Sequence, residues 1–388
     1  MDRESLKYWL ALSAVEEVGC VNFRTLLKAF ASPREVFSAP GRILQAIPGI
    51  GPKIADNIRS FSSWQVIEEQ LDHAEKIGVE IITFDDPRYP QNLLNTYDYP
   101  PFLYVKGSLL PSELCVALVG SRLASVYGRF TTEKLGRELA LKGLTIVSGL
   151  ARGIDSAAHR GALAANGRTI AVLGTGIDTV YPPENEKLAA DIVKKGALVS
   201  EFPLGTPPNA SNFPARNRII SGISVGVVVV EAGAKSGSLI TARIAAEQGR
   251  SVFAVPGEIG AAGSKGTNHL IRQGATLIEG VDDILEELSP QIAAFQTVEK
   301  GDVAPAEPKS LPAADDAETP PIRPTPEKTL TEEEKTLFSL LSSGPTDLDT
   351  LIEKSSMSAG IVQGALLTLE LGGLVKRLPG KHFCLKES

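Results

Sequence analysis

Loops that combine glycine, hydroxyl and arginine residues recur in the central part of this sequence, each directly after a short apolar segment. Three of them are Gly120-Ser121-Arg122, Ser148-Gly149-Leu150-Ala151-Arg152-Gly153 and Gly174-Thr175-Gly176. Glycine leaves backbone amides accessible and arginine supplies a permanent cation. Such loops are therefore suited to bind anions, phosphate above all.

A fourth loop, residues 231–238, joins an apolar run to a helix that we expect to begin near Leu239. A lysine and several hydroxyl groups at a helix N-terminus favour an anion site there over a simple helix cap. The side chains concerned are Lys235, Ser236, Ser238 and, in the first turn of the expected helix, Thr241.

The segment 209–224 places an aromatic ring, an amide and two guanidiniums around the expected start of another helix. These residues are Phe213, Arg216, Asn217 and Arg218. Guanidiniums bind phosphates, an aromatic face stacks on a base and an amide bonds base edges, so the set is suited to bind an unpaired nucleic-acid strand. In the alternative interpretation, Arg218 pairs with Glu201 or Glu231 and Phe213 packs in the interior.

The elements that must position these loops alternate regularly along the chain. Apolar runs at 115–119, 145–147, 169–173 and 225–230 are separated by amphipathic segments such as 126–142. This alternation predicts an α/β fold with a Rossmann-like parallel sheet. Ligands of such sheets bind at the carboxyl ends of the strands, so we expect the chemistry of this chain to sit on its loops.

The charge of the chain is unevenly distributed. The whole sequence of 388 residues has a formal net charge of −7, yet residues 115–280 contain 18 Lys and Arg against 12 Asp and Glu. Residues 281–335 contain only 5 Lys and Arg against 14 Asp and Glu. The net charge of the whole chain therefore conceals a basic central domain. Binding to a polyanion would account for its excess of cations, and an ordinary solvated surface would account for it equally.

The length and composition predict several domains. Residues 1–80 are expected to form a small helical domain of the helix-hairpin-helix or SAM-like type, because Ile47-Pro48-Gly49-Ile50-Gly51-Pro52-Lys53 fits the hairpin. Its glycine turn could expose amides to a phosphate or could only make a turn. A Rossmann-like domain at 81–288 follows.

Residues 289–328 are predicted to be a Pro-rich, acidic linker, and residues 329–388 a winged-helix-like domain with three helices and a hairpin. The helices are expected at 330–341, 348–353 and 358–371. The third helix lacks a strong basic stripe, so duplex binding and protein binding both remain open for this domain.

Several classes of site have no support in the sequence. The chain has no GxxxxGK[ST] motif, and the loop at Gly174 does not open a helix as a dinucleotide loop would. Cys20, Cys115 and Cys384 are isolated from each other, and His159 is expected to make a packing or hydrogen-bonding contact. We predict no cofactor, no metal site and no catalytic set, and no membrane span or secretion signal, which makes the cytoplasm the default location.

The ordered motifs of the central domain resemble those of the DNA-processing protein A family, also called DprA or Smf. The matching elements are Gly120-Ser121-Arg122, Ser148 to Asp155 with His159, Gly174-Thr175-Gly176 with Tyr181-Pro182, Ser200-Glu201, Phe213-Pro214 with Arg216-Asn217-Arg218-Ile219-Ile220-Ser221, Ser236 to Ala242, Val255-Pro256-Gly257 and Gly266-Thr267-Asn268. Each motif alone is weak, whereas their order along the chain is specific.

The resemblance implies a non-enzymatic protein of natural transformation that binds single-stranded DNA, protects incoming strands, and loads RecA by displacing single-strand-binding protein. It implies a homodimer formed through the later helices and strands of the Rossmann-like domain. By matching position, the DNA contacts are Arg122, Phe213, Arg216, Asn217, Arg218, Lys235 and Ser236, with Ser121, Ser238 and Thr241 beside them. Gly149, Arg152, Gly153, Gly174 and Gly176 would shape the pocket. Pro183 stands where some members carry a basic residue.

An enzymatic alternative remains. Nucleotide phosphoribohydrolases have similar Rossmann domains with a glutamate after a late strand, and Glu231 has a comparable position. Their PGGxGT loop is replaced here by Ala232-Gly233-Ala234-Lys235-Ser236.

Overall fold

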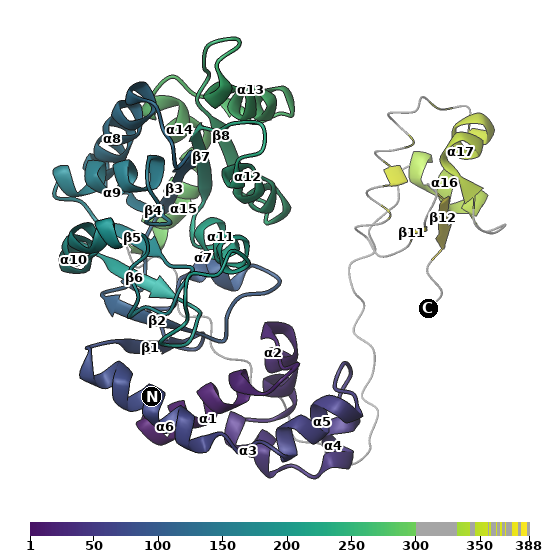
Figure 1. Ribbon diagram of the computed structural model, residues 1–388. Helices are drawn as coiled ribbons and strands as arrows, with labels where there is room; N and C mark the ends of the chain where they lie inside the picture. The colour runs from purple at the N-terminus through teal and green to yellow at the C-terminus, as the bar shows by residue number, and fades with distance from the viewer. Residues whose placement is uncertain are drawn as a thin grey trace. The chain divides into compact units, whose positions relative to one another are not determined.

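The computed structural model divides the chain into two compact units, Met1–Pro305 and Ala306–Ser388. It describes residues 1–299 of the first unit, and residues 332–341, 346–355, 357, 362, 365–366, 369, 375–378 and 382–385 of the second (Figure 1). Most of the expected linker and most of the expected helix 358–371 lie outside the described residues.

A nine-stranded sheet with the order β1-β2-β6-β5-β4-β3-β7-β8-β9 forms the centre of the first unit (Figure 1). All neighbouring strands from β6 to β9 are parallel, while β2 pairs antiparallel with β6 and with β1. The strands are β1 Glu80–Thr83, β2 Phe102–Gly107, β3 Cys115–Gly120, β4 Thr145–Ser148, β5 Thr169–Val172, β6 Ala197–Ser200, β7 Gly226–Glu231, β8 Ser251–Ala254 and β9 Thr276–Leu277. The predicted Rossmann-like sheet is thus confirmed.

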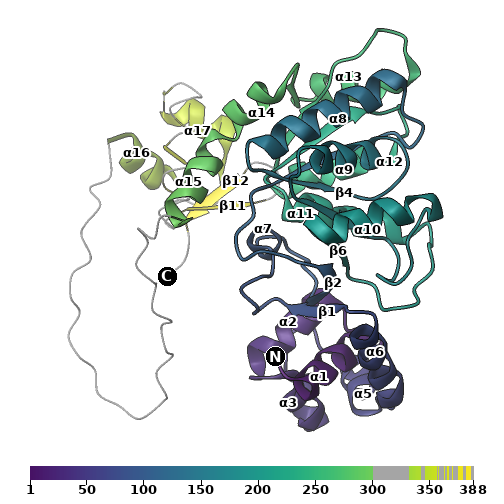
Figure 2. The same ribbon diagram turned by 90° about the vertical axis from the view of Figure 1, so that its left-hand side faces the viewer.

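Helices cover both faces of this sheet because alternate residues of its strands are apolar on each side. Val116 and Leu118 of β3 belong to one hydrophobic cluster, and Ala117 and Val119 to another. The first cluster is completed by α8 (Val126–Leu141), α9 (Ile154–Ala164) and α14 (Val281–Glu287), and the second by α11 (Asn212–Ile223) and α12 (Gly237–Glu247). Helices α8 and α9 lie side by side (Figure 2). The remaining helices of this part are α7 (Gln91–Leu94), α10 (Glu186–Lys195) and α13 (Lys265–Arg272), with short 3-10 turns at Pro183–Asn185 and Ala262–Ser264.

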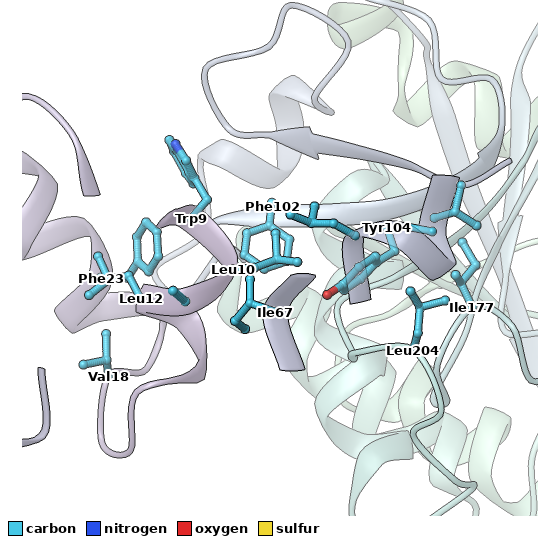
Figure 3. Close-up of a cluster of buried hydrophobic side chains, with 14 of the residues drawn as sticks. Trp9, Leu10, Leu12, Val18, Phe23, Ile67, Phe102, Tyr104, Ile177 and Leu204 are labelled. Atoms are coloured by element: carbon cyan, nitrogen blue, oxygen red, sulfur yellow. The ribbon is translucent and has the colours of Figure 1, made fainter. Parts of the chain in front are cut away.

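The N-terminal helices are not separated from the sheet. They are α1 Arg3–Ala14, α2 Cys20–Ala29, α3 Pro33–Ser38, α4 Gly41–Gln45, α5 Pro52–Arg59 and α6 Trp64–Lys76. Their buried side chains, among them Trp9 and Ile67, belong to the same hydrophobic cluster as Phe102 and Tyr104 of β2 (Figure 3). The expected helical region 1–80 therefore folds as one compact unit with the sheet, because both contribute to one core.

The expected hairpin lies between α4 and α5, with Gly49 at φ +86° and Gly51 as the N-cap of α5. Lys53, the cation beside this hairpin, forms an ion pair of 2.5 Å with Glu17. The carboxylate neutralises the charge that phosphate binding would use, and this observation favours the scaffold interpretation of the hairpin.

The expectation that the linker begins at Ser289 is wrong for its first residues. Residues Ser289–Glu299 form helix α15. Ile292 and Phe295 of this helix pack against the hydrophobic cluster under α8 and α14. The helix forms because these two apolar residues, three positions apart, lie on one face and extend that core.

In the second unit, α16 (Glu332–Leu341) and α17 (Leu348–Ser355) agree with two expected helices. The expected hairpin is present as β11 (Val375–Leu378) antiparallel to β12 (His382–Leu385). A short strand that the sequence did not indicate, β10 (Thr346–Asp347), pairs with β12. The hydrophobic core of the second unit contains Leu337, Leu351, Leu366 and Phe383.

Within the described parts of the chain, no helix has both the length and the apolar character needed to cross a membrane. Cys20 and Cys115 are free thiols.

Candidate nucleic-acid interface

A hollow of about 850 Å³ opens at the carboxyl ends of β3 and β7. After β3 the chain continues to β4, β5 and β6 on one side, and it then returns to β7 on the other side of β3. The loops after β3 and β7 therefore diverge and leave a crevice, the position at which open α/β sheets bind ligands. Helix α11 forms a further wall of the hollow.

Most of the predicted site residues lie in the lining of this hollow. They are Ser121 and Arg122 after β3, Phe213, Arg216 and Asn217 of α11, and Lys235, Ser236, Ser238 and Thr241 at the start of α12. Residues from three separate motifs of the sequence are thus brought together, because parallel strands place their carboxyl ends at one edge.

The ring of Phe213 is the centre of an aromatic and cationic cluster. The guanidinium carbon of Arg122 lies 5.1 Å from the ring centroid and that of Arg216 lies 5.9 Å from it. The ring of Tyr181, which also lines the hollow, is 5.9 Å away with an interplanar angle of 39°. Such a cluster offers a stacking face for a base directly beside cations for its phosphate.

Arg216 is buried, with 4% of its surface exposed, and it is held in place by the backbone. Its Nη1 donates hydrogen bonds to the carbonyl oxygens of Gly149, at 2.6 Å, and of Val172. Burial lowers the pKa of Arg216 to about 10, and Arg122 acts in the same direction while Asp155 opposes it. The guanidinium therefore stays charged at neutral pH and provides a fixed cation at the floor of the hollow.

Asp155 is a residue of this site that the sequence analysis did not single out. Its carboxylate accepts hydrogen bonds from the backbone amides of Gly149, at 3.1 Å, and Ala151, at 3.4 Å. Burial raises its pKa, and the Arg216 cation and the two amides oppose that shift. Its position in the sequence could have indicated this role, because an acidic residue in the first turn of the helix after a glycine loop is placed to bind the loop amides.

The glycines predicted to shape the pocket do so from behind its lining. A Cβ on Gly174 would lie 2.9 Å from the Phe213 ring, and one on Gly149 would collide with the Arg216 guanidinium. Gly153 has φ +72°, and a Cβ there would collide with the backbone oxygen of Ser121. Gly176 similarly faces Pro203 and Asp178 closely. These positions need glycine so that α11 and the loops can approach each other.

Two predicted contacts lie elsewhere. Arg218 forms an ion pair with Glu201 and donates a hydrogen bond of 2.6 Å to the backbone oxygen of Asp98, so the alternative interpretation of this residue is the one observed. Arg152 is exposed outside the hollow and is ion-paired with Glu184. Residues two positions apart on a helix point in nearly opposite directions, which separates Arg218 from Arg216.

The start of α12 has the expected hydroxyl groups. Ser236 caps the helix by accepting a hydrogen bond of 3.4 Å from the amide of Ser238, and the two hydroxyl oxygens lie 2.8 Å apart. Lys235 is exposed at the rim, and no ion pair is observed for it within the described part of the chain. The helix begins at Gly237, earlier than expected, so Thr241 lies in its second turn.

Glu231 and His159 have structural partners. The Glu231 carboxylate accepts hydrogen bonds from the Ser125 amide, at 3.0 Å, and from its hydroxyl, at 2.6 Å. His159 is fully buried, and its Nδ1 lies 2.7 Å from the Thr169 hydroxyl. The hydrogen-bonding role expected for His159 is confirmed, while the engaged Glu231 carboxylate is poorly placed to activate a nucleophile.

Comparisons with known proteins show which family this chain resembles. Residues 80–289 match the family model of the DNA recombination-mediator protein A, and residues 320–381 match that of the DprA winged helix domain. Protein Smf of Escherichia coli is 42% identical over 333 residues, 83% of this chain and 82% of the relative. Protein Smf of Synechocystis is 36% identical over 97% of this chain and 98% of the relative.

Two solved structures are similar in fold and sequence. That of DNA processing protein A from Streptococcus pneumoniae has a TM-score of 0.63 and 36% identity, covering 72% of this chain and 97% of the other. That of DNA processing protein A from Helicobacter pylori, described for its single-stranded DNA binding mode, has a TM-score of 0.50 and 32% identity, covering 55% and 97%. The chain belongs to the DprA/Smf family of DNA-processing proteins.

Proposed function

We propose that this protein binds single-stranded DNA in the hollow between β3 and β7 and acts as a binding protein, not as an enzyme. The observation that carries the proposal is the cluster of Arg122, Phe213 and Arg216, which combines a stacking face with two cations. The Helicobacter pylori relative, whose structure is described by its single-stranded DNA binding mode, supports the same partner.

The arrangement favours an unpaired strand over a duplex. A base can reach the Phe213 ring only when it is free to leave its pair, because the ring lies within a hollow and not on a raised surface. Phosphates on either side of that base would meet Arg122 and Lys235, whose side chains are both exposed. Serine hydroxyls and helix amides at the start of α12 add uncharged donors.

Salt-dependent binding of labelled single-stranded and duplex oligonucleotides tests this proposal. Arg122→Ala is expected to weaken binding of the single strand and to reduce the slope of log K against log salt by about 0.7, the value for one lost phosphate contact on single strands. Fluorescence anisotropy across a salt series measures both quantities.

Arg137→Ala is the matched control, because Arg137 is an exposed arginine of α8 that does not line the hollow. It is expected to leave the slope nearly unchanged. Equal slopes for Arg122→Ala and wild type, or equal affinity for single strand and duplex, would refute the proposed site.

We further propose, from family membership, that the bound strand is protected and passed to RecA with displacement of single-strand-binding protein. Nuclease resistance of the bound strand and RecA assembly on coated strands are the activities to measure. The phosphoribohydrolase alternative has no observation in its favour, since both oxygens of Glu231 accept hydrogen bonds from Ser125. Release of free base from nucleoside monophosphates would revive it.

We also propose that two copies associate through the β9 edge of the sheet. Among the strands that the structure describes, β9 pairs with β8 alone. Leu277 on this strand is 45% exposed, and Ile259, which lines the same surface hollow as Leu277, is 97% exposed. An edge strand with exposed apolar side chains is a surface that another chain can cover. Two copies would present two hollows to one strand and raise avidity.

A further inference from the structure

A stripe of exposed apolar side chains begins directly beside the hollow. It consists of Leu123 in the turn after β3 and of Val126, Tyr127 and Phe130 in the first two turns of α8. Their exposed fractions are 91%, 75%, 63% and 69%, in that order. We call these four residues the α8 stripe.

The hydrophobic core does not explain the α8 stripe. Helix α8 packs on the sheet through Leu135 and Leu139, which are buried in the cluster shared with α9. Tyr127 and Phe130 are neighbours on the helix surface because they are three positions apart. Large apolar side chains grouped in this way on a surface commonly mark an interaction site.

The α8 stripe is continuous with the hollow. Leu123 lines the hollow and follows Arg122, whose guanidinium lies over the Phe213 ring. Arg129 is exposed on the same two helical turns, and its Nη1 donates a hydrogen bond of 2.5 Å to the backbone oxygen of Ala124. Within the described residues neither guanidinium has an ion-pair partner, so both can meet phosphates.

The helix end itself is closed to phosphate. The Glu231 carboxylate accepts a hydrogen bond of 3.0 Å from the Ser125 amide and so neutralises the positive end of α8. A phosphate is therefore expected on the arginines and not on the helix N-terminus. The ring of Tyr127 lies between Arg122 and Arg129 in the sequence and that of Phe130 directly follows Arg129, so both rings remain as apolar contact area beside these arginines.

We propose that the α8 stripe is a second stacking platform, on which bases of the single strand lie after the strand leaves the hollow. This inference rests on the proposed function of the hollow. Exposed aromatic rings beside cations are the chemistry with which proteins hold successive unpaired bases without regard to sequence. The platform extends the binding site from one base at Phe213 to several, which a protein that covers a strand requires.

Photocrosslinking to an oligonucleotide that carries 5-iododeoxyuridine at successive positions tests the platform in the full-length protein. Trypsin cleavage after Arg and Lys places Phe130 and Phe213 in different peptides, while Leu123, which also lines the hollow, shares a peptide with Tyr127. The stripe falls in peptides 123–129 and 130–134, and Phe213 falls in peptide 196–216. Crosslinks are expected in the hollow peptide at one position of the label and in the stripe peptides at positions further along the strand.

The double variant Tyr127→Ala/Phe130→Ala supplies an affinity measurement. It is expected to raise Kd about tenfold for an oligonucleotide of about twenty nucleotides, and to raise it less for a strand of about four nucleotides, which leaves little chain beyond the hollow to lie on the stripe. Tyr127→Phe keeps the ring and should bind like wild type. Tyr97→Ala is the matched control, because Tyr97 is 79% exposed and does not line the hollow.

The outcomes separate this inference from the proposed function. Crosslinks in the hollow peptide alone, with equal Kd for the double variant and wild type, would overturn the platform and leave the hollow intact. Absence of crosslinks in the hollow peptide would overturn the proposed function itself. A double variant that binds long strands normally but no longer binds RecA would assign the stripe to a protein partner and would likewise refute the platform.

Discussion

At the scale of single residues, the buried His159 couples stability to pH. The Thr169 hydroxyl donates to the Ile146 backbone oxygen at 2.8 Å, so it accepts the hydrogen of His159 Nδ1. The other ring nitrogen, Nε2, is buried and has no hydrogen-bond partner among the residues that the structure describes. Burial lowers the pKa of His159 to about 3, with smaller contributions from Arg216 and Arg160, so the ring is neutral in the folded protein.

A histidine with a depressed folded pKa gives its full stability above its unfolded pKa of about 6.5, and that stability is lost as the pH falls toward about 3. Between pH 7.5 and pH 5 the loss is expected to be about 2 kcal/mol. His159→Asn keeps a donor for Thr169 but cannot titrate, so its unfolding free energy should fall less over this range. Denaturant unfolding at both pH values measures the difference.

Glu201 changes stability in the opposite direction, because burial raises its pKa to about 7 against the effect of Arg218. The comparison between wild type and His159→Asn removes this contribution, which both proteins share. The same pH dependence in both proteins would contradict the assignment of a neutral buried ring.

At the scale of elements, helix α11 connects the hollow to the rest of the unit. Arg216 on this helix reaches the ends of β4 and β5, while Arg218 reaches Glu201 after β6 and Asp98. The side chains of Arg218 and Glu201 are only 14% and 12% exposed. Arg218 therefore fixes the helix that carries the stacking ring.

Arg218→Met is expected to lower the free energy of unfolding by about 3–5 kcal/mol, because it leaves the Glu201 carboxylate buried without its cation. The double variant Arg218→Met/Glu201→Gln removes both charges and should recover part of that loss. Denaturant unfolding measures both effects. If the folded single variant also lost a phosphate contact in the salt series, Arg218 would be a DNA ligand after all.

At the scale of the whole molecule, the proposed association through the β9 edge sets the number of hollows that one strand can meet. Leu277→Glu places a charge on that edge and is expected to shift the protein from dimer to monomer and to weaken binding of long strands by loss of avidity. Light scattering after size-exclusion chromatography measures the mass. Leu141→Glu, at an exposed leucine at the end of α8, is the control.

A wild-type protein that is monomeric at all concentrations, or a Leu277→Glu variant that remains dimeric, would rule out this edge as the interface. Because the control carries the same added charge, a change common to both variants would come from charge and not from the interface.

The sequence by itself determined four central strands of the sheet, β3, β4, β5 and β7, and the loops that follow them. The apolar runs and the loops after them fix the carboxyl ends of β3, β4, β5 and β7, and parallel pairing brings those ends together. Arg122 and Lys235 could therefore be assigned to one site although 112 positions separate them. The motifs also sufficed to indicate the family, which the comparisons confirm.

Only the tertiary structure decided which neighbouring residues share the site. Arg216 and Arg218 are equivalent in the sequence, but the helical twist directs one to the hollow and the other to Glu201. The ion pair between Arg152 and Glu184 likewise depends on a contact between separate segments. Helix α15 forms where Ile292 and Phe295 pack against a core whose residues are mostly distant in the sequence. Local pattern specifies strands and loops, whereas ion pairs and shared cores depend on contacts between distant segments.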